Sequence, residues 1–318
     1  FERDIRDFAR TCCAVKNFRR ARIGMIGPRP EPFETCAFNE IAMIQQFQQR
    51  VVPFTLAEVF RDANALADND PAVTAIVADM KKRIGDCIEI EEGPILKSAK
   101  LEVILLRRAE KNKLSGMGVQ CWDAMQDVYG ISSCTAMGRL TERGIMTSCE
   151  VDIHGALTML LQYGAAQKAT VPHFIDWTIQ HQEKENVFLA WHCGNAPLCL
   201  ASEGTRACLR SHSVLFRVKG SDISQGTCEF QLAPGPVTLN RLVEYDGCFK
   251  LLITKGEIIP SDQNLRGSWS WVEVPNLKKL YRTLVEEGFI HHASMIHGDL
   301  TVSLANFCKF MGVEAVVV

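Results

Sequence analysis

Four short segments of the sequence place carboxylate and imidazole side chains in otherwise apolar surroundings. They are residues 148–155, 174–177, 191–197 and 290–299. A carboxylate in an apolar setting is costly to bury unless a cation or hydrogen-bond donors pair with it. Two carboxylates and one imidazole suit Mn²⁺, Mg²⁺ or Co²⁺ and leave coordination positions for substrate oxygens. Glu150, Asp176 and the adjacent pair His291 and His292 are therefore candidate metal ligands.

Each candidate also has an ordinary structural interpretation. Glu150 precedes a predicted helix, whose N-terminus favours a negative charge, so it could act as a cap. Asp152 is then a surface residue or a support for a neighbouring ligand. Asp176 could be a helix N-cap or part of a surface turn, and adjacent histidines are more often found in a turn than at a metal. Spacing alone does not show that these residues meet in space.

The first half of the chain alternates between short strands and helices. Strands are predicted at residues 22–26, 51–54, 118–122 and 145–149. This alternation predicts a largely parallel sheet with helices on both faces, in a Rossmann-like α/β domain over residues 21–165. Ligands bind beyond the carboxyl ends of the strands in such sheets. Glu150 directly follows the last of these predicted strands.

The pattern changes after about residue 165, where turn signals separate a series of short β candidates. They lie at residues 187–191, 214–218, 227–232, 237–239 and 249–253. Asp246-Gly247 is a favoured hairpin turn because both residues tolerate positive φ. Residues 166–318 are therefore predicted to form a mainly antiparallel, barrel-like β domain with flanking helices. The charged residues 1–20 are predicted to be a linker or a leading helix.

Composition excludes several classes of function. A net charge of −2 argues against a nucleic-acid binder, which needs a surplus of Lys and Arg. No apolar run reaches the roughly 18 residues of a membrane span, and the charged start lacks the apolar region of a signal peptide. The 13 cysteines are odd in number and form no Cys-x-x-Cys. They predict reduced thiols in a cytoplasmic protein, most of them acting as small buried hydrophobic residues.

Three segments, in order, resemble the L-fucose isomerase family. Residues 149–159 (CEVDIHGALTM) resemble the segment with the family's metal-binding glutamate. Residues 174–177 (FIDW) resemble the segment with its metal-binding aspartate. His292, followed by residues 298–300 (GDL) and an apolar helix, resembles its metal-binding histidine segment. Residues 22–27 (RIGMIG) look like the start of the family's second domain, so the resemblance runs from about residue 20 to the C-terminus.

The resemblance implies a metal-dependent aldose–ketose isomerase that acts on an open-chain sugar such as L-fucose or D-arabinose. Glu150, Asp176 and His292 would hold Mn²⁺, with Mg²⁺ or Co²⁺ as alternatives. The metal would act as a Lewis acid on the sugar, while Glu150 and Asp176 move protons through a cis-enediol. The sequence does not assign the acid and the base.

Four further residues are predicted to contact the sugar. Gln120 and Trp122 end a predicted strand, and His192 lies in the third polar segment. Aromatic faces bind sugar C–H surfaces, and amide or imidazole groups bind hydroxyls. The alternative is that Trp122 is a core aromatic and His192 a buried ring with its hydrogen bonds satisfied. His291 stands where the family tends to have Asn before its metal histidine, a departure that bears on sugar preference.

The resemblance also implies an assembly. Relatives are hexamers or trimers, so a homo-oligomer with a monosaccharide substrate is expected, with neither nucleic acid nor membrane as a partner. The family's N-terminal domain, which helps to close the active site of a neighbouring subunit, is expected to be missing from this sequence. That expectation bears on how complete the substrate site is.

Two other functions are compatible with the sequence. A non-catalytic sugar-binding or regulatory protein would reuse the fold, since a fold does not fix a function. The presence of all three types of ligand argues against this alternative, because a binding protein does not need two carboxylates around a metal. A thiol-based redox protein is supported only by the number of cysteines.

Overall fold

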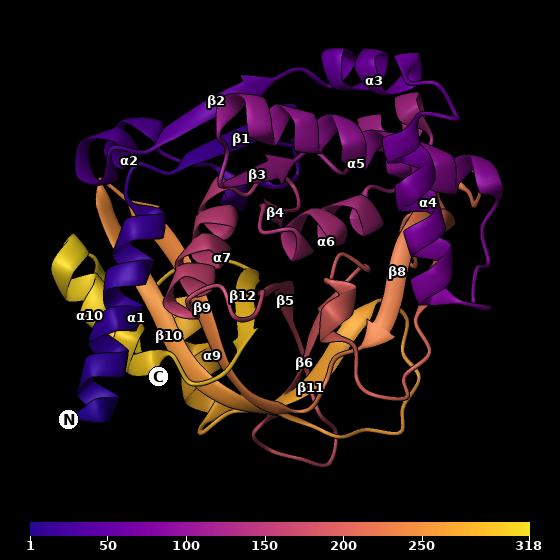
Figure 1. Ribbon diagram of the computed structural model, residues 1–318. Coiled ribbons are helices and arrows are strands. Elements are labelled where there is room, and N and C mark those ends of the chain that lie inside the picture. Colours follow the sequence, from indigo (N-terminus) through magenta and orange to yellow (C-terminus); the bar gives the residue numbers. More distant parts are fainter.

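Two sheets of different construction make up the protein, and the computed structural model describes all residues, 1–318 (Figure 1). The first sheet is parallel, with strand order β2-β1-β3-β4. Its strands are β1 (Arg22–Ile26), β2 (Arg50–Phe54), β3 (Gly116–Val119) and β4 (Met146–Ser148). The helices of this half are α2 (Glu40–Phe47), α3 (Leu56–Ala65), α4 (Pro71–Ile84), α5 (Glu92–Asn112), α6 (Cys134–Glu142) and α7 (Ile153–Ala165). The predicted parallel α/β architecture is confirmed.

The second sheet closes on itself. Its strand order is β13-β10-β9-β12-β5-β6-β11-β8-β7, and a further pairing of β10 with β11 joins six strands into a ring. All neighbours in this ring are antiparallel. The strands are β5 (His173–Gln180), β6 (Val187–His192), β7 (Cys208–Ser211), β8 (Gln225–Gln231), β9 (Gly235–Tyr245), β10 (Cys248–Ile259), β11 (Ser268–Glu273), β12 (His292–His297) and β13 (Glu314–Val317). The predicted mainly antiparallel, barrel-like architecture is therefore confirmed as well.

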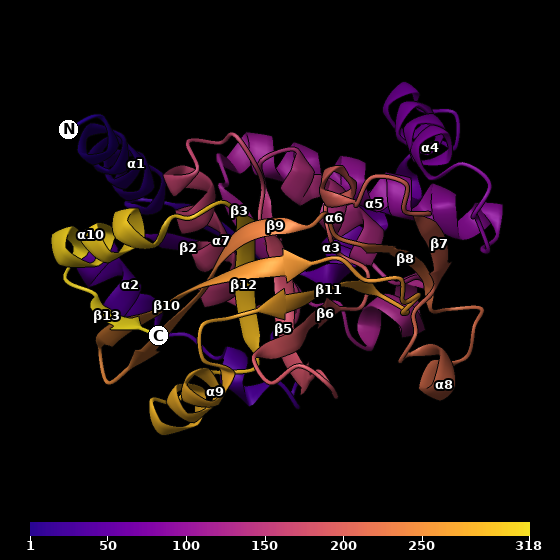
Figure 2. The same cartoon turned by 90° about the horizontal axis from the view of Figure 1, so that it is seen from below.

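Helices join the two sheets. In Figure 1, α1 (Glu2–Phe18) and α10 (Thr301–Met311) stand beside the barrel strand β10, with α7 between them and the parallel sheet. Figure 2 shows α9 (Leu277–Glu286) on the outside of the barrel. One apolar cluster runs from Phe18 through the parallel sheet to Phe307. The division into domains between residues 165 and 166 stays a prediction. No helix is long and apolar enough to cross a bilayer.

Some local predictions were wrong. Residues 214–218 were expected to form a strand, but they form a turn and the short helix α8 (Phe216–Lys219). Val214, Phe216 and Val218 are 42%, 39% and 76% exposed, and Leu215 alone of the apolar side chains in this segment is buried, so the alternation does not mark a strand with a core-facing side. The strand expected at 118–122 ends at Val119, because the chain turns there and Asp123 adopts a left-handed conformation. Strand β12 was not predicted. It forms because its backbone pairs with both β5 and β9.

The expectation of reduced thiols is wrong at one pair of cysteines. Cys87 and Cys208 form a disulfide that joins residues 121 positions apart. A parallel bridge between the next residues, Ile88 and Leu209, holds the two segments together, and the Cα atoms of Cys87 and Cys208 lie 4.7 Å apart, a separation that suits this bond. Of the eleven free cysteines, seven are buried, in line with the prediction that most act as small hydrophobic side chains.

The packing of α1 gives a stability prediction. Phe18 is fully buried and makes edge contacts with Phe47 and Phe307, at centroid distances of 5.0 and 5.1 Å. Phe18→Ala is expected to lower the free energy of unfolding by about 3–5 kcal/mol, because it leaves a cavity between three helices. Phe8→Ala on the same helix is the control, since Phe8 is 57% exposed. Urea unfolding that shows equal losses for the two variants would contradict this account.

Candidate metal centre

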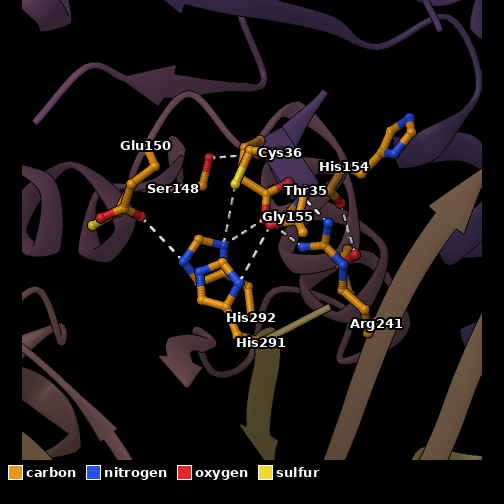
Figure 3. Close-up of polar contacts among 12 residues, drawn as sticks. Thr35, Cys36, Ser148, Glu150, His154, Gly155, Arg241, His291 and His292 are labelled. Carbon is orange, nitrogen blue, oxygen red and sulfur yellow. Dashed lines mark hydrogen bonds and ion pairs between the residues drawn. The ribbon is translucent and has the colours of Figure 1, made fainter. Parts of the chain in front are cut away.

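Glu150, Asp176 and His292 meet where the parallel sheet faces the barrel. His292 Nε2 lies 3.1 Å from Glu150 Oε2 and 3.6 Å from Asp176 Oδ1. Glu150 follows β4, whereas Asp176 and His292 lie opposite each other in the antiparallel ladder of β5 and β12. Figure 3 shows the Glu150 carboxylate directed at the His292 ring. The structure thus brings together three side chains that are far apart in the sequence.

The residues present fit a divalent cation. Glu150 Oε2 and Asp176 Oδ1 are buried and make no hydrogen bond, although both lie beside His292 Nε2. Unsatisfied buried carboxylate oxygens are costly, and a cation between them would remove that cost. Burial raises the pKa of Asp176 to about 7, against the opposing charge of His292. The set of two oxygens and one imidazole nitrogen suits Mn²⁺ or a similar ion, and the assignment of these ligands stays a prediction.

Asp152 and Arg241 hold the His292 ring from its other side. Asp152 Oδ2 lies 2.9 Å from His292 Nδ1. Arg241 donates from both terminal nitrogens to Asp152, and its Nη2 lies 3.0 Å from Oδ1. Burial opposes ionisation of Asp152, but the charges of Arg241 and His292 hold its pKa well below the usual range. A carboxylate on one ring nitrogen fixes the orientation of a histidine and leaves the other nitrogen for a metal.

The turn after β4 decides which carboxylate caps helix α7. Asp152 Oδ1 accepts a hydrogen bond from the Gly155 backbone N–H at 2.8 Å, so Asp152 is the cap and Glu150 is not. Asp152 is also buried, which excludes its interpretation as a surface residue. Glu150 and Val151 adopt positive φ angles of 50° and 58°. Such a conformation is uncommon outside glycine and most unfavourable for a β-branched residue, and strain of this kind is concentrated at functional sites.

His192 lies on a further side of the centre. One of its ring nitrogens is within 4.8 Å of both a Glu150 oxygen and a His292 nitrogen. Its Nδ1 accepts the backbone N–H of Cys193 at 2.9 Å. Burial lowers the pKa of His192 well below its usual value, so the ring is neutral and its single proton is on Nε2. This tautomer offers a hydrogen-bond donor and has no free lone pair for a metal.

The other predicted substrate residues are divided between two places. His291 packs on His292 with ring centroids 3.9 Å apart. Phe33 lies between His291 and Trp122, at centroid distances of 6.3 and 5.7 Å, and the three rings form an aromatic wall. Gln120 packs against Gly27, where an added Cβ would lie 2.4 Å from the Gln120 side-chain oxygen, and this buried oxygen has no hydrogen-bond partner. Contact of these residues with a sugar stays a prediction.

Sequence reasoning missed three residues of this region. Phe33 and Cys36 lie in the loop after β1, which carries no motif, yet Cys36 Sγ is 3.7 Å from His292 Nδ1. Arg241 did have a signal. It is a lone cation within the apolar strand β9, and a fully buried arginine requires an acidic partner.

The fold and the site together define a mixed α/β protein that joins a parallel sheet to a closed antiparallel barrel, with a candidate metal centre at their junction. Residues 190–318 match the family model of the L-fucose isomerase C-terminal domain. This match confirms the resemblance to the L-fucose isomerase family over the part of the chain that contains the His292 segment.

Similar curated proteins include several sulfoquinovose isomerases. That of Alkalicoccus urumqiensis is 27% identical over 305 residues, which cover 95% of this chain and 66% of that protein. That of Priestia aryabhattai is 25% identical over 301 residues, or 94% of this chain and 65% of that protein. That of Clostridium sp. (strain MSTE9) is 30% identical over 208 residues, or 64% of this chain and 44% of that protein. The chain spans about two thirds of the length of the first two relatives.

The buried pair of Arg241 and Asp152 gives a second stability prediction. Arg241→Met is expected to lower the free energy of unfolding by about 3–5 kcal/mol, because Asp152 would be left as a buried charge without its main partner. The exposed Arg282→Met is the control, since 66% of its side chain is in solvent. Chemical denaturation of the double variant Asp152→Asn, Arg241→Met should show a loss smaller than the sum of the single losses. Strict additivity would contradict the coupling.

The protonation of the centre predicts how metal binding depends on pH. The pKa of Asp176 is raised to about 7, and contacts with Asp152 and Glu150 outweigh burial and raise the pKa of His292. Both groups therefore bind protons near neutral pH in the metal-free protein, and a metal must displace them. The increase in Tm on adding Mn²⁺ should be larger at pH 8 than at pH 6. An equal increase at both pH values, measured by calorimetry, would contradict the proposed ligand set.

Proposed function

We propose that this chain carries the catalytic centre of a divalent-metal-dependent aldose–ketose isomerase. The observation that carries the proposal is the convergence of two buried carboxylate oxygens, neither with a hydrogen-bond partner, within 3.6 Å of one imidazole nitrogen. The match to the L-fucose isomerase C-terminal domain and the similarity to sulfoquinovose isomerases support the same class of reaction. A binding protein does not need two buried carboxylates around one imidazole at its site.

Glu150, Asp176 and His292 would hold the ion, for which Mn²⁺ is proposed and Mg²⁺ or Co²⁺ are alternatives. When bound, the ion supplies Lewis acidity toward the sugar carbonyl and the neighbouring hydroxyl. The carboxylates then carry the proton chemistry. In the direction from aldose to ketose, one takes the proton from C2 and a proton returns to C1, while the hydroxyl proton on O2 passes to O1. The intermediate of this exchange is a cis-enediol.

The two carboxylates differ in how far they are exposed to solvent. The Asp176 side chain is 23% exposed, whereas that of Glu150 is 5% exposed. Because environments that differ in this way separate the tasks of paired carboxylates, Glu150 and Asp176 act as distinct acid and base groups. The His292 ring, oriented by Asp152, lies against both carboxylates.

Two groups of side chains orient the sugar in this proposal. His192 donates its Nε2 proton to a sugar oxygen, a role that follows from the bond its Nδ1 accepts from Cys193. The aromatic wall of Phe33, Trp122 and His291 contacts the C–H face of the open chain. A buried donor aimed at a substrate hydroxyl discriminates strongly against analogues that lack it, so His192 contributes to specificity.

The candidate substrates are monosaccharides. Sulfoquinovose is a candidate because the similar curated proteins are sulfoquinovose isomerases, and L-fucose and D-arabinose are candidates because of the family resemblance. We also propose a cytoplasmic homo-oligomer, a trimer or a hexamer, as the working form. The disulfide between Cys87 and Cys208 lies outside the centre.

Turnover of a sugar panel tests the proposal. The metal-loaded protein should interconvert at least one aldose with its ketose, and Glu150→Gln should lower kcat by roughly 100-fold or more, the usual contribution of general acid–base catalysis. Glu183→Gln, at an exposed carboxylate, is the matched control. Sugars are assayed by NMR with sulfoquinovose, L-fucose and D-arabinose, with and without Mn²⁺. A protein that leaves every common aldose unchanged in the presence of metal is not this enzyme.

A further inference from the structure

Two cysteines lie against the second oxygen of Glu150. Oε2 of that carboxylate faces His292, but Oε1 lies 3.5 Å from the Cys121 sulfur. The Glu150 backbone N–H also contacts this sulfur, at 3.4 Å. Cys149 directly precedes Glu150, and its sulfur, the Cys121 sulfur and a Glu150 oxygen all lie within 4.8 Å of one another. All three residues are buried, so this group borders the candidate centre from inside the protein.

The chemistry of this group differs from that of the centre beside it. Two thiolates and one carboxylate favour soft or borderline ions such as Zn²⁺ and Cd²⁺, whereas the oxygen-rich set with one imidazole accepts Mn²⁺ or Mg²⁺. Bonds of about 2.3 Å from Zn²⁺ to sulfur place neighbouring ligand atoms up to about 4 Å apart. Small side-chain rotations therefore suffice to bring the two sulfurs and the oxygen around one ion.

Asn195 adds an independent observation at the same place. Its amide nitrogen lies 3.4 Å from the Cys149 sulfur, in position to donate a hydrogen bond. The residue is 4% exposed, and its oxygen Oδ1 has no hydrogen-bond partner. Hydrogen bonds to a metal-bound thiolate stabilise its negative charge. The buried amide oxygen beside it, which has no hydrogen-bond partner, is a further atom that could bind the ion. The surroundings of Cys149 therefore suit a ligated sulfur.

We propose that Cys121, Cys149 and Glu150 form a second metal site that binds thiophilic divalent ions and shares Glu150 with the neighbouring centre. On binding, each thiol releases its proton to solvent, and the two thiolates and the carboxylate bond to the ion without any change in oxidation state. The shared carboxylate links the two sites. Zn²⁺ or Cd²⁺ bound to Oε1 at the thiol site draws on the charge of the carboxylate whose Oε2 faces His292, and so weakens Glu150 as a ligand and proton carrier at the neighbouring centre. Inhibition by these ions is the consequence, and this part rests on the proposed function.

Cys36 does not make a comparable site. It is the one thiol beside Asp152 and His292, and the other atoms there already bond to each other and to Arg241. A single sulfur among satisfied partners offers no set of ligands to a soft ion. The pairing of two thiols is what distinguishes the group at Glu150.

A cadmium titration tests the thiol site directly. In a background in which the accessible Cys12, Cys13, Cys199 and Cys248 are serine, metal-free protein is titrated with CdCl₂ and the ultraviolet charge-transfer band of Cd²⁺–thiolate bonds is followed. One equivalent of Cd²⁺ should give an absorbance that corresponds to two Cd²⁺–thiolate bonds. Cys121→Ser and Cys149→Ser should each weaken binding at least tenfold, whereas Cys308→Ser, a buried control in α10, should not. A band that survives in both single variants overturns the proposal.

Cadmium NMR of the protein with its buried cysteines intact keeps the test independent of how well the variants fold. A resonance in the range of mixed sulfur and oxygen ligation supports the site, and one in the range of only oxygen and nitrogen ligands overturns it. Inhibition is then measured separately. Cd²⁺ should inhibit isomerisation at concentrations that the Cys121→Ser and Cys149→Ser variants tolerate at least tenfold better, each relative to its own rate. If no sugar is isomerised, the proposed function fails, while the absorption and NMR results still decide the thiol site.

Discussion

The fold and the candidate site both depend on the buried carboxylate of Asp152. It caps helix α7 of the parallel half, pairs with Arg241 from barrel strand β9 and contacts His292 at the start of β12. Taking these charges out of water is costly, and the cost is offset only when every partner is in place. Asp152 therefore both links the two halves and fixes the orientation of His292. Loss of its carboxylate would disturb the fold and the candidate site together.

The parts of the site differ in how they are held. Glu150 is presented by a tight turn at the carboxyl end of a parallel strand, the position at which α/β sheets place ligands. Asp176 and His292 are presented by neighbouring antiparallel strands, whose register fixes their separation. The aromatic wall, by contrast, draws Phe33 and Trp122 from loops. Strands and the turn after β4 thus hold the candidate ligands, and loops hold two members of the aromatic wall, in line with the general placement of binding residues on loops positioned by a rigid scaffold.

The sequence predicted the two architectures because strand and helix periods, turn residues and their order are local properties. The strand prediction was wrong at residues 214–218, where apolar residues alternate but no partner strand is present. The motifs identified Glu150, Asp176 and His292, but spacing could not show their convergence, since that depends on pairing between β5 and β12 across more than a hundred residues. Arg241 and the disulfide between Cys87 and Cys208 were missed for the same reason, because each has meaning only beside a distant partner.

The closed ring of six strands has a consequence for how the molecule can move. A strand in an open sheet can slide along its neighbour, and a slip of one residue reverses which face each side chain occupies. In a closed ring, sliding β12 along β5 would also break its ladder with β9 and propagate around the circle. Asp176 and His292 are therefore locked opposite each other for as long as the barrel is intact. Flexibility at this site must come from the parallel half, through Glu150 and the loop after β1.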